Sequence, residues 1–450
     1  MVEISLLGML DIKFIRENLE LCKTAAKNKN REVDWDALLR LDEKRRELIE
    51  KRDAMKSEKN KVNDAIKQAI QQLSPEDRAD KEKKQKAVDE AVRQFSHPEG
   101  ELKALEDETR ATEEQFNLLM LTVPNVPDAS VPIGKDEHDN VEVKKVGKIP
   151  EFDFVPKDHI ELARSLDLID FDRGAKVGGF RAYFLKNEAA MLEFAVMFYA
   201  FQKLVAKGYT PLIAPSIVKE FTLFGNAQLP WGRDEVYHLE KDDMYLAGTA
   251  EVPVTSYFAD EMLLEKDLPK KFVAFSSCYR REAGSYGKDT KGVYRVHQFN
   301  KIEQVIVAPA ETSTSLTLHE ELLANSEEIL QDLGLPYRVL LMCTGDMGEP
   351  QVKKYDVETW MPGRPSAGSG YGNYGETMSN SFMGDFQSRR LKIRYKAKDG
   401  STKYVHTLNN TAIASPRILI AILENYQQAD GSIRIPEVLQ PLVGKKEIRR

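Results

Sequence analysis

The sequence predicts an α+β protein with a long antiparallel α-helical coiled-coil hairpin at the N-terminus, followed by a domain with an antiparallel β-sheet flanked by helices. Three observations predict this fold. Apolar residues recur every seven positions early in the chain, and this period ends in a proline-rich stretch. Strand-like and helix-like segments then mix without regular alternation. We therefore expect an arm at 1–120, a linker at 121–150 and a main domain at 151–450.

The first helix of the arm shows a coiled-coil pattern. Leu41, Leu48, Met55 and Val62 are spaced by seven residues. Neither glycine nor proline occurs between residues 32 and 73, so nothing in this range breaks a helix. The pattern predicts one long helix with an apolar seam along one side.

The return helix is predicted from its start signals. Ser74-Pro75 gives a helix N-cap followed by proline at the first helical position, so the second helix begins at once and returns antiparallel. His97-Pro98 is expected to kink it, where Ser96 and Glu99 form a capping-box pattern. Such a hairpin is too thin for a substrate pocket. It could be a dimerisation rod, a spacer or an arm that contacts a large partner.

Charge, cysteine content and hydropathy narrow the function classes. The net charge of −7 does not point to a nucleic-acid binder, although a local basic stripe is compatible with it. Cys22, Cys278 and Cys343 form no C-x-x-C pair, which favours a reducing compartment over a disulfide framework or a zinc site. We find no apolar run of roughly 18–20 residues and no signal peptide, so we expect a soluble cytoplasmic protein without a membrane partner.

Residues 40–67 carry ten basic and seven acidic side chains. This balance favours an anionic partner only mildly, and a solvated helix face explains it equally well. In the main domain there is no G-x-x-x-x-G-K-[ST] loop and no regular strand–helix alternation. A P-loop or Rossmann nucleotide site is therefore not expected, and an antiparallel sheet is the better interpretation.

The densest group of candidate functional residues lies at 275–307. A strand-like run ends near Arg280 and Glu282, a Gly- and charge-rich loop follows, and a second run passes Arg295 and Phe299. We expect a hairpin that brings these four side chains together. Guanidinium groups bind phosphate and an aromatic ring can stack on a base, so a nucleotide site is one interpretation. An edge hairpin with surface ion pairs is the other.

The spacing in this hairpin is more specific than its composition. Arg-x-Glu, a loop and Arg-x-x-x-Phe resemble motif 2 of class II aminoacyl-tRNA synthetases, which bind ATP on an antiparallel sheet without a P-loop. Further stretches resemble the seryl-tRNA synthetase family of the bacterial type. They are VPNVPDASVPIGKDEHDN, GTAEVP, CYRREAG, DTKGVYRVHQFNKIE, DFQSRRLKIRY and HTLNNTAIASPRILIAILENYQ. The resemblance covers the arm as well as the main domain, which it implies is a class II synthetase catalytic domain.

The resemblance implies an ATP-dependent ligation of L-serine to tRNA(Ser), and to tRNA(Sec) where that tRNA is present. The serine carboxylate attacks the α-phosphorus of ATP to give a seryl-adenylate, and a hydroxyl of the terminal adenosine of the tRNA then takes the seryl group. ATP and Mg²⁺ are the implied cofactors. Because a carboxylate is already a nucleophile, the first step needs positioning and positive charge rather than an activating histidine.

The resemblance also implies roles in ATP binding. Arg280 and Glu282 hold the α-phosphate and the adenine amino group, Phe299 stacks on adenine, and Arg417 grips the γ-phosphate. Glu376 and Ser379, in the stretch YGETMSNSF, are the implied Mg²⁺ ligands, since Mg²⁺ prefers hard oxygen donors. The full ATP-binding set that the resemblance implies is Arg280, Arg281, Glu282, Val296, Phe299, Glu376, Thr377, Met378, Ser379 and Arg417.

For serine, the resemblance implies a set that offers an acceptor for the ammonium group and partners for the hydroxyl group. A site that hydrogen-bonds a substrate hydroxyl rejects alanine strongly. This chain reads TLNNTA where the family frequently reads TLNGSG, so Asn410 and Ala412 replace glycines and Thr411 adds a methyl group. The implied serine-binding set is Thr249, Ala250, Glu251, Arg280, Glu303, Asn409 and Thr411.

Two macromolecular contacts follow from the same resemblance. The arm is expected to reach the long variable arm of serine tRNA, which is read largely by shape and backbone. GYTPLIAPSIV resembles motif 1, with Pro215 at the matching proline, and implies a homodimer. The implied tRNA contacts are Arg40, Arg45, Arg46, Arg52, Lys56 and Lys59.

Two other function classes remain as alternatives. A synthetase-like ligase that loads an amino acid onto a carrier protein would share the catalytic domain but lack the tRNA-binding arm. A non-catalytic homologue, kept as a binding or scaffold protein, would have lost catalytic side chains. The intact hairpin argues against the first, and the presence of Arg280, Glu282, Glu376 and Arg417 argues against the second.

Overall fold

The computed structural model describes residues 10–92, 99–283, 291–365 and 371–450. The chain forms two compact units. The arm unit comprises residues 11–19 and 32–123, and the main unit comprises residues 20–31 and 124–450, with residue 10.

The arm unit is a helical hairpin, as the seven-residue repeat predicts. Its first long helix, α3, is capped by Asp34, whose side chain accepts a hydrogen bond from the Ala37 N–H, and it packs against α5 and α6. The Ser74 hydroxyl accepts from the Asp77 N–H and starts the return, with proline at the first helical position. The helices of the arm are α1 (Ile12–Glu17), α3 (Trp35–Gln72), α4 (Pro75–Ala79), α5 (Lys81–Val92) and α6 (Glu99–Met120). The predicted kink at His97-Pro98, with Ser96, lies outside the described residues.

Several of the basic residues expected to touch tRNA make ion pairs within the arm. Asp42, which is 1% exposed, pairs with Arg45 at 3.0 Å and Arg46 at 3.2 Å. The Arg45 guanidinium also lies 4.3 Å from the centre of the Phe116 ring. Arg52 pairs with Asp53 and Lys56 with Glu106, while Arg40 and Lys59 are exposed. Arg45 therefore joins α3 to α6, a structural role that the sequence did not indicate.

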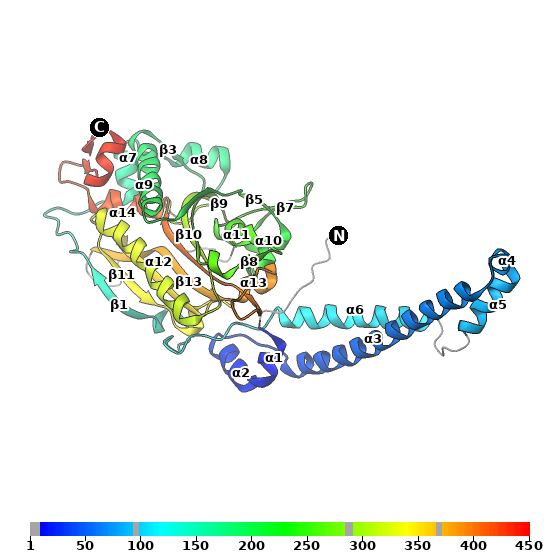
Figure 1. The fold of residues 1–450 in the computed structure, drawn as a ribbon. Helices are drawn as coiled ribbons and strands as arrows, with labels where there is room; N and C mark the ends of the chain where they lie inside the picture. Colours follow the sequence, from blue (N-terminus) through cyan, green and yellow to red (C-terminus); the bar gives the residue numbers. More distant parts are fainter. Residues whose placement is uncertain (1–9, 93–98, 284–290, 366–370) are drawn as a thin grey trace. The chain divides into compact units, whose positions relative to one another are not determined.

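The main unit is built on an eight-stranded sheet in which all neighbours are antiparallel except β4 and β9 (Figure 1). Because side chains alternate along a strand, the sheet presents two faces. One face packs against α9, α12 and α14 in the largest apolar core, and the other contributes to a smaller core. The strands run in the order β1 (Val141–Val146), β11 (Tyr337–Leu341), β12 (Lys353–Pro365), β13 (Tyr371–Gly384), β16 (His406–Ala414), β10 (Gln298–Ala308), β9 (Lys270–Tyr279) and β4 (Thr210–Ile213).

Helices and small sheets surround this large sheet. The helices are α2 (Leu19–Asn28), α7 (His159–Ser165), α8 (Phe171–Gly178), α9 (Asn187–Ala206), α10 (Glu220–Gly225), α11 (Glu251–Thr255), α12 (Thr312–Asp332), α13 (Phe386–Leu391), α14 (Arg417–Asn425) and α15 (Gln440–Val443). The small sheets pair β2 (Ile169–Asp170) with β3 (Phe184–Leu185), and β17 (Ile433–Arg434) with β18 (Glu447–Ile448). Two three-stranded sheets hold β5 (Ile217–Lys219), β7 (Met244–Leu246) and β6 (Tyr237–Leu239), and β15 (Thr402–Tyr404), β14 (Arg394–Lys396) and β8 (Met262–Leu264).

Of the expected linker at 121–150, residues 124–150 belong to the main unit in the structure. Val141 pairs with Leu341 and Val146 with Tyr337, so β1 forms an edge of the large sheet. Asn125 donates from Nδ2 to the carbonyl oxygens of Pro350 and Met383 at 3.0 and 2.8 Å. Sequence reasoning missed this strand for two reasons. The clustered prolines suggested a linker, and the pairing partner of the strand lies about 200 residues further along the chain.

The expectation that no run is apolar enough to span a membrane needs a correction. Among the described residues, helix α9 is long and apolar enough by length and composition alone. Leu192, Val196, Ala200 and Leu204 on one side of α9 are buried in the main core. A buried core helix meets the same criterion of length and composition, so α9 is weak evidence for a membrane span.

A buried lysine fixes a loop of the main unit. The Lys29 ammonium is 1% exposed and donates to the backbone carbonyls of Gly348, Glu349 and Gln351 at 3.1, 3.1 and 2.6 Å. Burial lowers the pKa of Lys29 to about 7. In the unfolded chain the amine keeps its proton up to a pH of about 10.4.

Replacing Lys29 by Met should lower the free energy of unfolding by about 2 kcal/mol, because three buried carbonyls lose their donor. The unfolded wild-type chain binds more protons than the folded one between pH 7 and 10, so wild-type stability should rise with pH there. The Lys29→Met variant should lack this rise. Urea denaturation at several pH values measures both effects, with the exposed Lys27→Met as control. Parallel pH profiles of wild type and Lys29→Met would contradict the assignment.

Candidate active site

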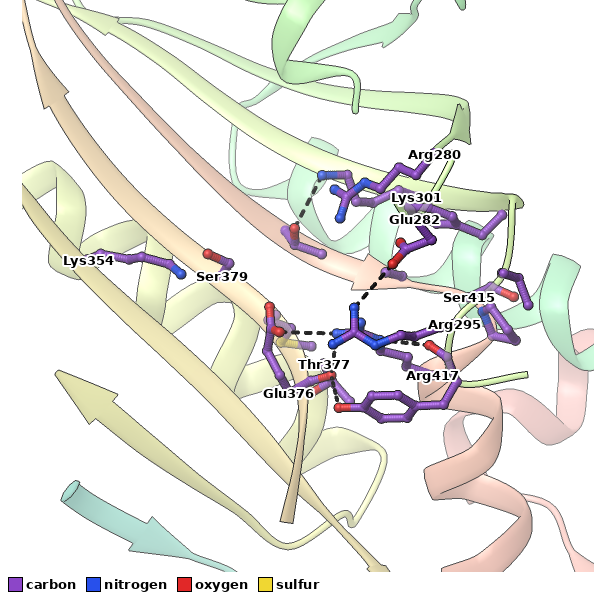
Figure 2. Close-up of a pocket in the computed structure, with 17 residues that line it drawn as sticks. Arg280, Glu282, Arg295, Lys301, Lys354, Glu376, Thr377, Ser379, Ser415 and Arg417 are labelled. Atoms are coloured by element: carbon purple, nitrogen blue, oxygen red, sulfur yellow. Dashed lines mark hydrogen bonds and ion pairs between the residues drawn. The ribbon is translucent and has the colours of Figure 1, made fainter. Parts of the chain in front are cut away.

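A cleft in the main unit gathers most of the residues expected to bind ATP. It holds a cavity of about 270 Å³ between the ends of the central strands and the start of α14. Figure 2 shows charged side chains converging on it from the segment that follows β9, from β10, β12 and β13, and from the start of α14. The expected ATP-binding residues that line it are Arg280, Glu282, Val296, Phe299, Glu376, Thr377, Met378, Ser379 and Arg417.

The predicted hairpin brings its four side chains together. The Arg280 guanidinium lies 5.3 Å from the centre of the Phe299 ring, and Arg295 pairs with Glu282 at 3.2 Å. Because β10 begins only at Gln298, Arg295 precedes the strand rather than lying in it. The surface ion-pair interpretation is therefore wrong for this hairpin, since all four residues line the cleft.

Arg417, at the first position of α14, hydrogen-bonds two other segments that line the cleft. It donates from Nε to the Tyr294 carbonyl at 3.1 Å, and from one terminal nitrogen to the Glu376 carbonyl and carboxylate at 3.0 and 3.2 Å. Burial opposes the Arg417 charge, but the Glu376 carboxylate outweighs it and raises the Arg417 pKa. Burial also acts against ionisation of Glu376, whereas Arg417 and Lys354 prevail and lower its pKa. The Glu376 side chain is 43% exposed, so an ionised carboxylate is accessible in the cleft.

A lysine and an aspartate that the sequence did not single out lie beside this carboxylate. Lys354 lines the cleft and pairs with Asp356 at 3.1 Å, and Asp356 is opposite Ser379 in the register of β12 and β13. In Figure 2 the Lys354 ammonium and the Ser379 hydroxyl lie on the same side of the cleft as Glu376. The strand spacing of Lys354 and Asp356 was the available signal, since residues two apart share one face.

The residues expected to bind serine form a buried polar cluster next to the cleft. Thr249 is 4% exposed, Glu303 1% and Asn409 6%, and only Thr411 of this set, apart from Arg280, lines the cavity itself. Glu251 accepts hydrogen bonds from Gln387 Nε2 at 2.7 Å and Asn409 Nδ2 at 3.0 Å. Burial, with a further contribution from the Glu303 charge, raises the Glu251 pKa to about 7. The cluster therefore holds two carboxylates that compete for ionisation.

Lys301 is the functional residue that sequence reasoning missed in this cluster. Its ammonium is ion-paired with Glu303 and donates to the Thr249 hydroxyl at 2.7 Å and the Thr411 hydroxyl at 3.4 Å. It lines the cavity floor together with Thr411. The alternation of Phe299, Lys301 and Glu303 along one strand was the signal that could have found it.

Some expected site residues direct their side chains elsewhere. The Met378 side chain is part of the main core, and the Thr377 hydroxyl is bonded to Thr359 at 2.7 Å. These two residues would meet a ligand through their backbone. Asn410 donates to Leu322 and Ser326 on the helix side of the sheet, so its change from glycine does not alter the cleft. Arg281 is exposed, and Ala250 is fully buried.

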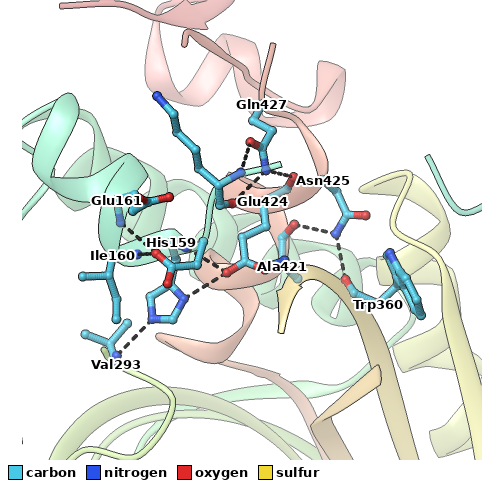
Figure 3. Close-up of polar contacts among 12 residues, drawn as sticks. His159, Ile160, Glu161, Val293, Trp360, Ala421, Glu424, Asn425 and Gln427 are labelled. Atoms are coloured by element: carbon cyan, nitrogen blue, oxygen red, sulfur yellow. Dashed lines mark hydrogen bonds and ion pairs between the residues drawn. The ribbon is translucent and has the colours of Figure 1, made fainter. Parts of the chain in front are cut away.

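A second cavity, of about 460 Å³, adjoins the first and shares Tyr294 with it. Figure 3 shows the polar contacts beside it. Glu424 accepts from the His159 N–H, the His159 Nδ1–H and the Gly363 N–H at 2.8 to 2.9 Å. With Nδ1 donating, Nε2 is free to accept from the Val293 N–H at 3.4 Å. This network fixes the return of the 275–307 hairpin just before Tyr294.

Comparison with known proteins places this geometry in a family. Residues 9–127 match the profile of the seryl-tRNA synthetase N-terminal domain, and residues 235–426 match the class II core domain shared by the G, H, P, S and T synthetases. The chain is 44% identical to the serine–tRNA ligase of Deinococcus radiodurans over 98% of its own length and 99% of that protein. The chain belongs to the seryl-tRNA synthetase family. A serine–tRNA ligase of Treponema denticola is also 44% identical, over 97% of this chain and 99% of the relative.

Solved structures agree with this membership. The seryl-tRNA synthetase of Pyrococcus horikoshii, complexed with ATP, superposes with a TM-score of 0.82 at 38% identity, covering 98% of this chain and 99% of that one. The cytoplasmic enzyme of Naegleria fowleri, in complex with AMP, gives 0.82 at 32% identity over 98% of both chains. The recognition of the family and of its α+β fold from sequence is thereby confirmed.

Replacing Arg417 by Gln should weaken ATP binding by about 10- to 100-fold. A charge-assisted hydrogen bond contributes about 1.5–3 kcal/mol, and each 1.4 kcal/mol changes a dissociation constant tenfold. Isothermal titration calorimetry with ATP measures the loss, and the exposed Arg434→Gln is the matched control. An unchanged dissociation constant in Arg417→Gln would exclude Arg417 from the nucleotide site.

Proposed function

We propose that this protein ligates L-serine to tRNA(Ser), and to tRNA(Sec) where that tRNA is present, through a seryl-adenylate. In the first step a serine carboxylate oxygen attacks the α-phosphorus, the bond from that phosphorus to the β-phosphate oxygen breaks, and pyrophosphate leaves. In the second, the 2′- or 3′-hydroxyl of the terminal adenosine attacks the seryl carbonyl carbon and AMP leaves. The observation that carries the proposal is a cationic nucleotide cleft whose floor opens on a small buried polar cluster.

The cleft residues have distinct parts in this proposal. Arg280 binds the α-phosphate, where negative charge develops as the serine carboxylate attacks. Phe299 stacks on adenine, Glu282 accepts from its amino group, and Arg417 binds the γ-phosphate. These side chains are held by the sheet and by α14, so ATP is positioned by groups that need little reorganisation.

The donors in the cleft fit a magnesium ion. Glu376 offers an ionised, accessible carboxylate, and Ser379 adds a hydroxyl oxygen from the same strand, which is the hard donor set that Mg²⁺ prefers. Mg²⁺ bound there would neutralise phosphate charge. Asp356, next to Ser379, keeps one carboxylate oxygen buried and without a hydrogen-bond partner among the described residues. That oxygen could orient water on the ion.

Serine would enter the polar cluster behind the cavity floor. Glu303 and Glu251 are the acceptors for its ammonium group, and Thr249, Thr411 and Asn409 are partners for its hydroxyl and carboxylate. The Ala250 side chain lies in the smaller apolar core, so Ala250 would meet serine through its backbone. The cluster is small and polar, which fits serine better than a larger or apolar amino acid.

The arm is proposed to bind the long variable arm of tRNA(Ser). Basic side chains on α3 would contact phosphates of an RNA helix, which is recognised largely by shape. Arg40, Arg46, Lys56 and Lys59 are the exposed members of the expected set, but Arg46, like Arg45, is engaged with Asp42. We therefore place the larger contribution on Arg40, Arg52, Lys56 and Lys59.

A homodimer is proposed through an exposed apolar face of α9 and the segment around Pro215. Phe194 is 76% exposed and Ile213 84%, with Met191, Phe198 and Ile217 also exposed nearby in the chain. Large exposed apolar faces mark interaction surfaces. A second copy of this chain is the proposed partner, and the cytoplasm is the proposed location.

Serine-dependent ATP–pyrophosphate exchange, followed by charging of tRNA(Ser), tests the proposed function. The wild type should exchange with serine and charge the tRNA, and Glu376→Gln should lose at least 100-fold of exchange while remaining folded by circular dichroism. Exchange with another amino acid instead of serine would refute the substrate. Exchange without any tRNA charging would support the carrier-protein ligase.

Deletion of residues 40–115 separates the arm from the cleft in the same assay. The truncated protein should keep serine-dependent exchange within a few-fold and lose tRNA charging, because the described residues that line the cleft all belong to the main unit. Equal loss of both reactions would contradict the role proposed for the arm.

Replacing Phe194 by Glu should convert the dimer into a monomer, because it buries a charge in an apolar interface. Sedimentation velocity measures the mass. Val155→Glu, at a residue that is 65% exposed and outside the proposed face, is the control and should stay dimeric. A Phe194→Glu protein that remains a dimer would place the interface elsewhere.

A further inference from the structure

Lys301 occupies an unusual place for a lysine. It lies in the middle of β10 and is 5% exposed, and its ammonium sits where the cleft meets the polar cluster. Three polar side chains surround the ammonium: Glu303 as its ion-pair partner, with the Thr249 and Thr411 hydroxyls as acceptors. An ammonium group has three hydrogens to donate, so these contacts use all of them.

These contacts determine whether each threonine hydroxyl is still able to donate a hydrogen bond. The Thr249 oxygen accepts from Lys301 at 2.7 Å and from the Glu251 backbone N–H at 3.1 Å. A hydroxyl oxygen has two lone pairs and one hydrogen, so both lone pairs of Thr249 are used. Its remaining capacity is that of a donor. Thr411 accepts the longer Lys301 contact and donates to Glu303 at 3.3 Å, so its hydrogen is already committed.

Lys301 also acts on the charge of the cluster. Glu303 and Glu251 are both buried, and the pKa of each is raised by burial, with Glu303 adding to the effect on Glu251. Lys301 is the cation bonded directly to Glu303, while Arg280 acts on both carboxylates from the neighbouring strand end. Without the Lys301 ammonium, burial would favour a neutral Glu303, which could donate a hydrogen bond and no longer be a pure acceptor.

We propose that Lys301 is a positioning residue that sets amino-acid specificity, by fixing Thr249 as a hydrogen-bond donor and Glu303 as a charged acceptor. This inference rests on the proposed function. A substrate that supplies an ammonium group and a hydroxyl oxygen satisfies both groups. Alanine supplies the ammonium but leaves the Thr249 hydroxyl without an acceptor in a buried site, which is costly.

With a neutral side chain at position 301, Thr249 is no longer fixed as a donor, nor Glu303 as a charged acceptor. The Thr249 and Thr411 hydroxyls can then rotate and pair with each other or with Glu303, so the cluster no longer requires a hydroxyl from the substrate. Discrimination between serine and alanine should fall even though the ATP site is unchanged. If Lys301 contributed to stability alone, its replacement would lower the activities with serine and with alanine together.

The test compares Lys301→Met with the wild type in pyrophosphate exchange with serine and with alanine, together with calorimetric binding of ATP. Lys301→Met should raise the KM for serine at least tenfold and lower the serine-to-alanine ratio of kcat/KM at least tenfold. Its ATP dissociation constant should stay within twofold. Lys271→Met is the matched control, since Lys271 lies on the adjacent strand β9, forms an ion pair with Glu321 of α12 and does not line the cleft.

Thr249→Val tests the same hydrogen bond in a second way, because valine keeps the shape of threonine and removes the hydroxyl donor. It should also lower the serine-to-alanine ratio, and the double variant should lose no more than the larger single loss, since both act through one hydrogen bond. A Lys301→Met protein that binds ATP normally and keeps the wild-type ratio would overturn the proposal, as would additive losses in the double variant. A wild type without serine-dependent exchange would instead refute the proposed function.

Discussion

The register of β10 between its two neighbours determines which of its side chains enter the cleft and the polar cluster beside it. Phe299 is opposite Cys278 on β9, Lys301 is opposite Ser276 and Ala414, and a bulge then brings Glu303 opposite Thr411. Because side chains alternate, Phe299, Lys301 and Glu303 share one face, while Ile302, Gln304 and Ile306 face the helices. A slip of one residue would turn the three polar and aromatic groups into the core and the apolar ones into the cleft. The apolar core on the helix side therefore holds the site in register.

That register also concentrates opposite charges where water is scarce. Arg280, Lys354 and Arg417 surround Glu376, and Lys301 is bonded to Glu303. Each charge lowers the cost of burying its partner, whereas removing one would leave the other uncompensated. The cations that balance Glu376 can also bind phosphate when ATP enters, whereas Lys301 stays with Glu303. The cleft thus combines structural ion pairs with a surface prepared for a polyanion, as electrostatic preorganisation requires.

Sequence alone predicted much of this protein, and the exceptions have physical reasons. The heptads of the arm and the Ser74-Pro75 helix start are local patterns, and the structure shows both. The edge strand β1 was missed because its partner is distant in sequence and the prolines around it suggest a linker. Lys301 and Lys354 were missed because a strand lysine resembles a surface residue until the packing of neighbouring strands shows that it is buried. Motif spacing found most of the residues that line the cleft, but not the two lysines that line it with them.

The central claim is that one cleft holds the nucleotide against Phe299 and Arg417 and the amino acid against the Lys301 cluster. A crystal structure with a non-hydrolysable sulfamoyl analogue of seryl-adenylate tests this most directly. The account predicts adenine stacked on Phe299, the sulfamoyl group at Arg280, and the seryl group within hydrogen-bond distance of the cluster formed by Thr249, Glu303 and Thr411. An analogue bound in the second cavity beside His159 and Glu424, or one whose seryl group points away from this cluster, would contradict it.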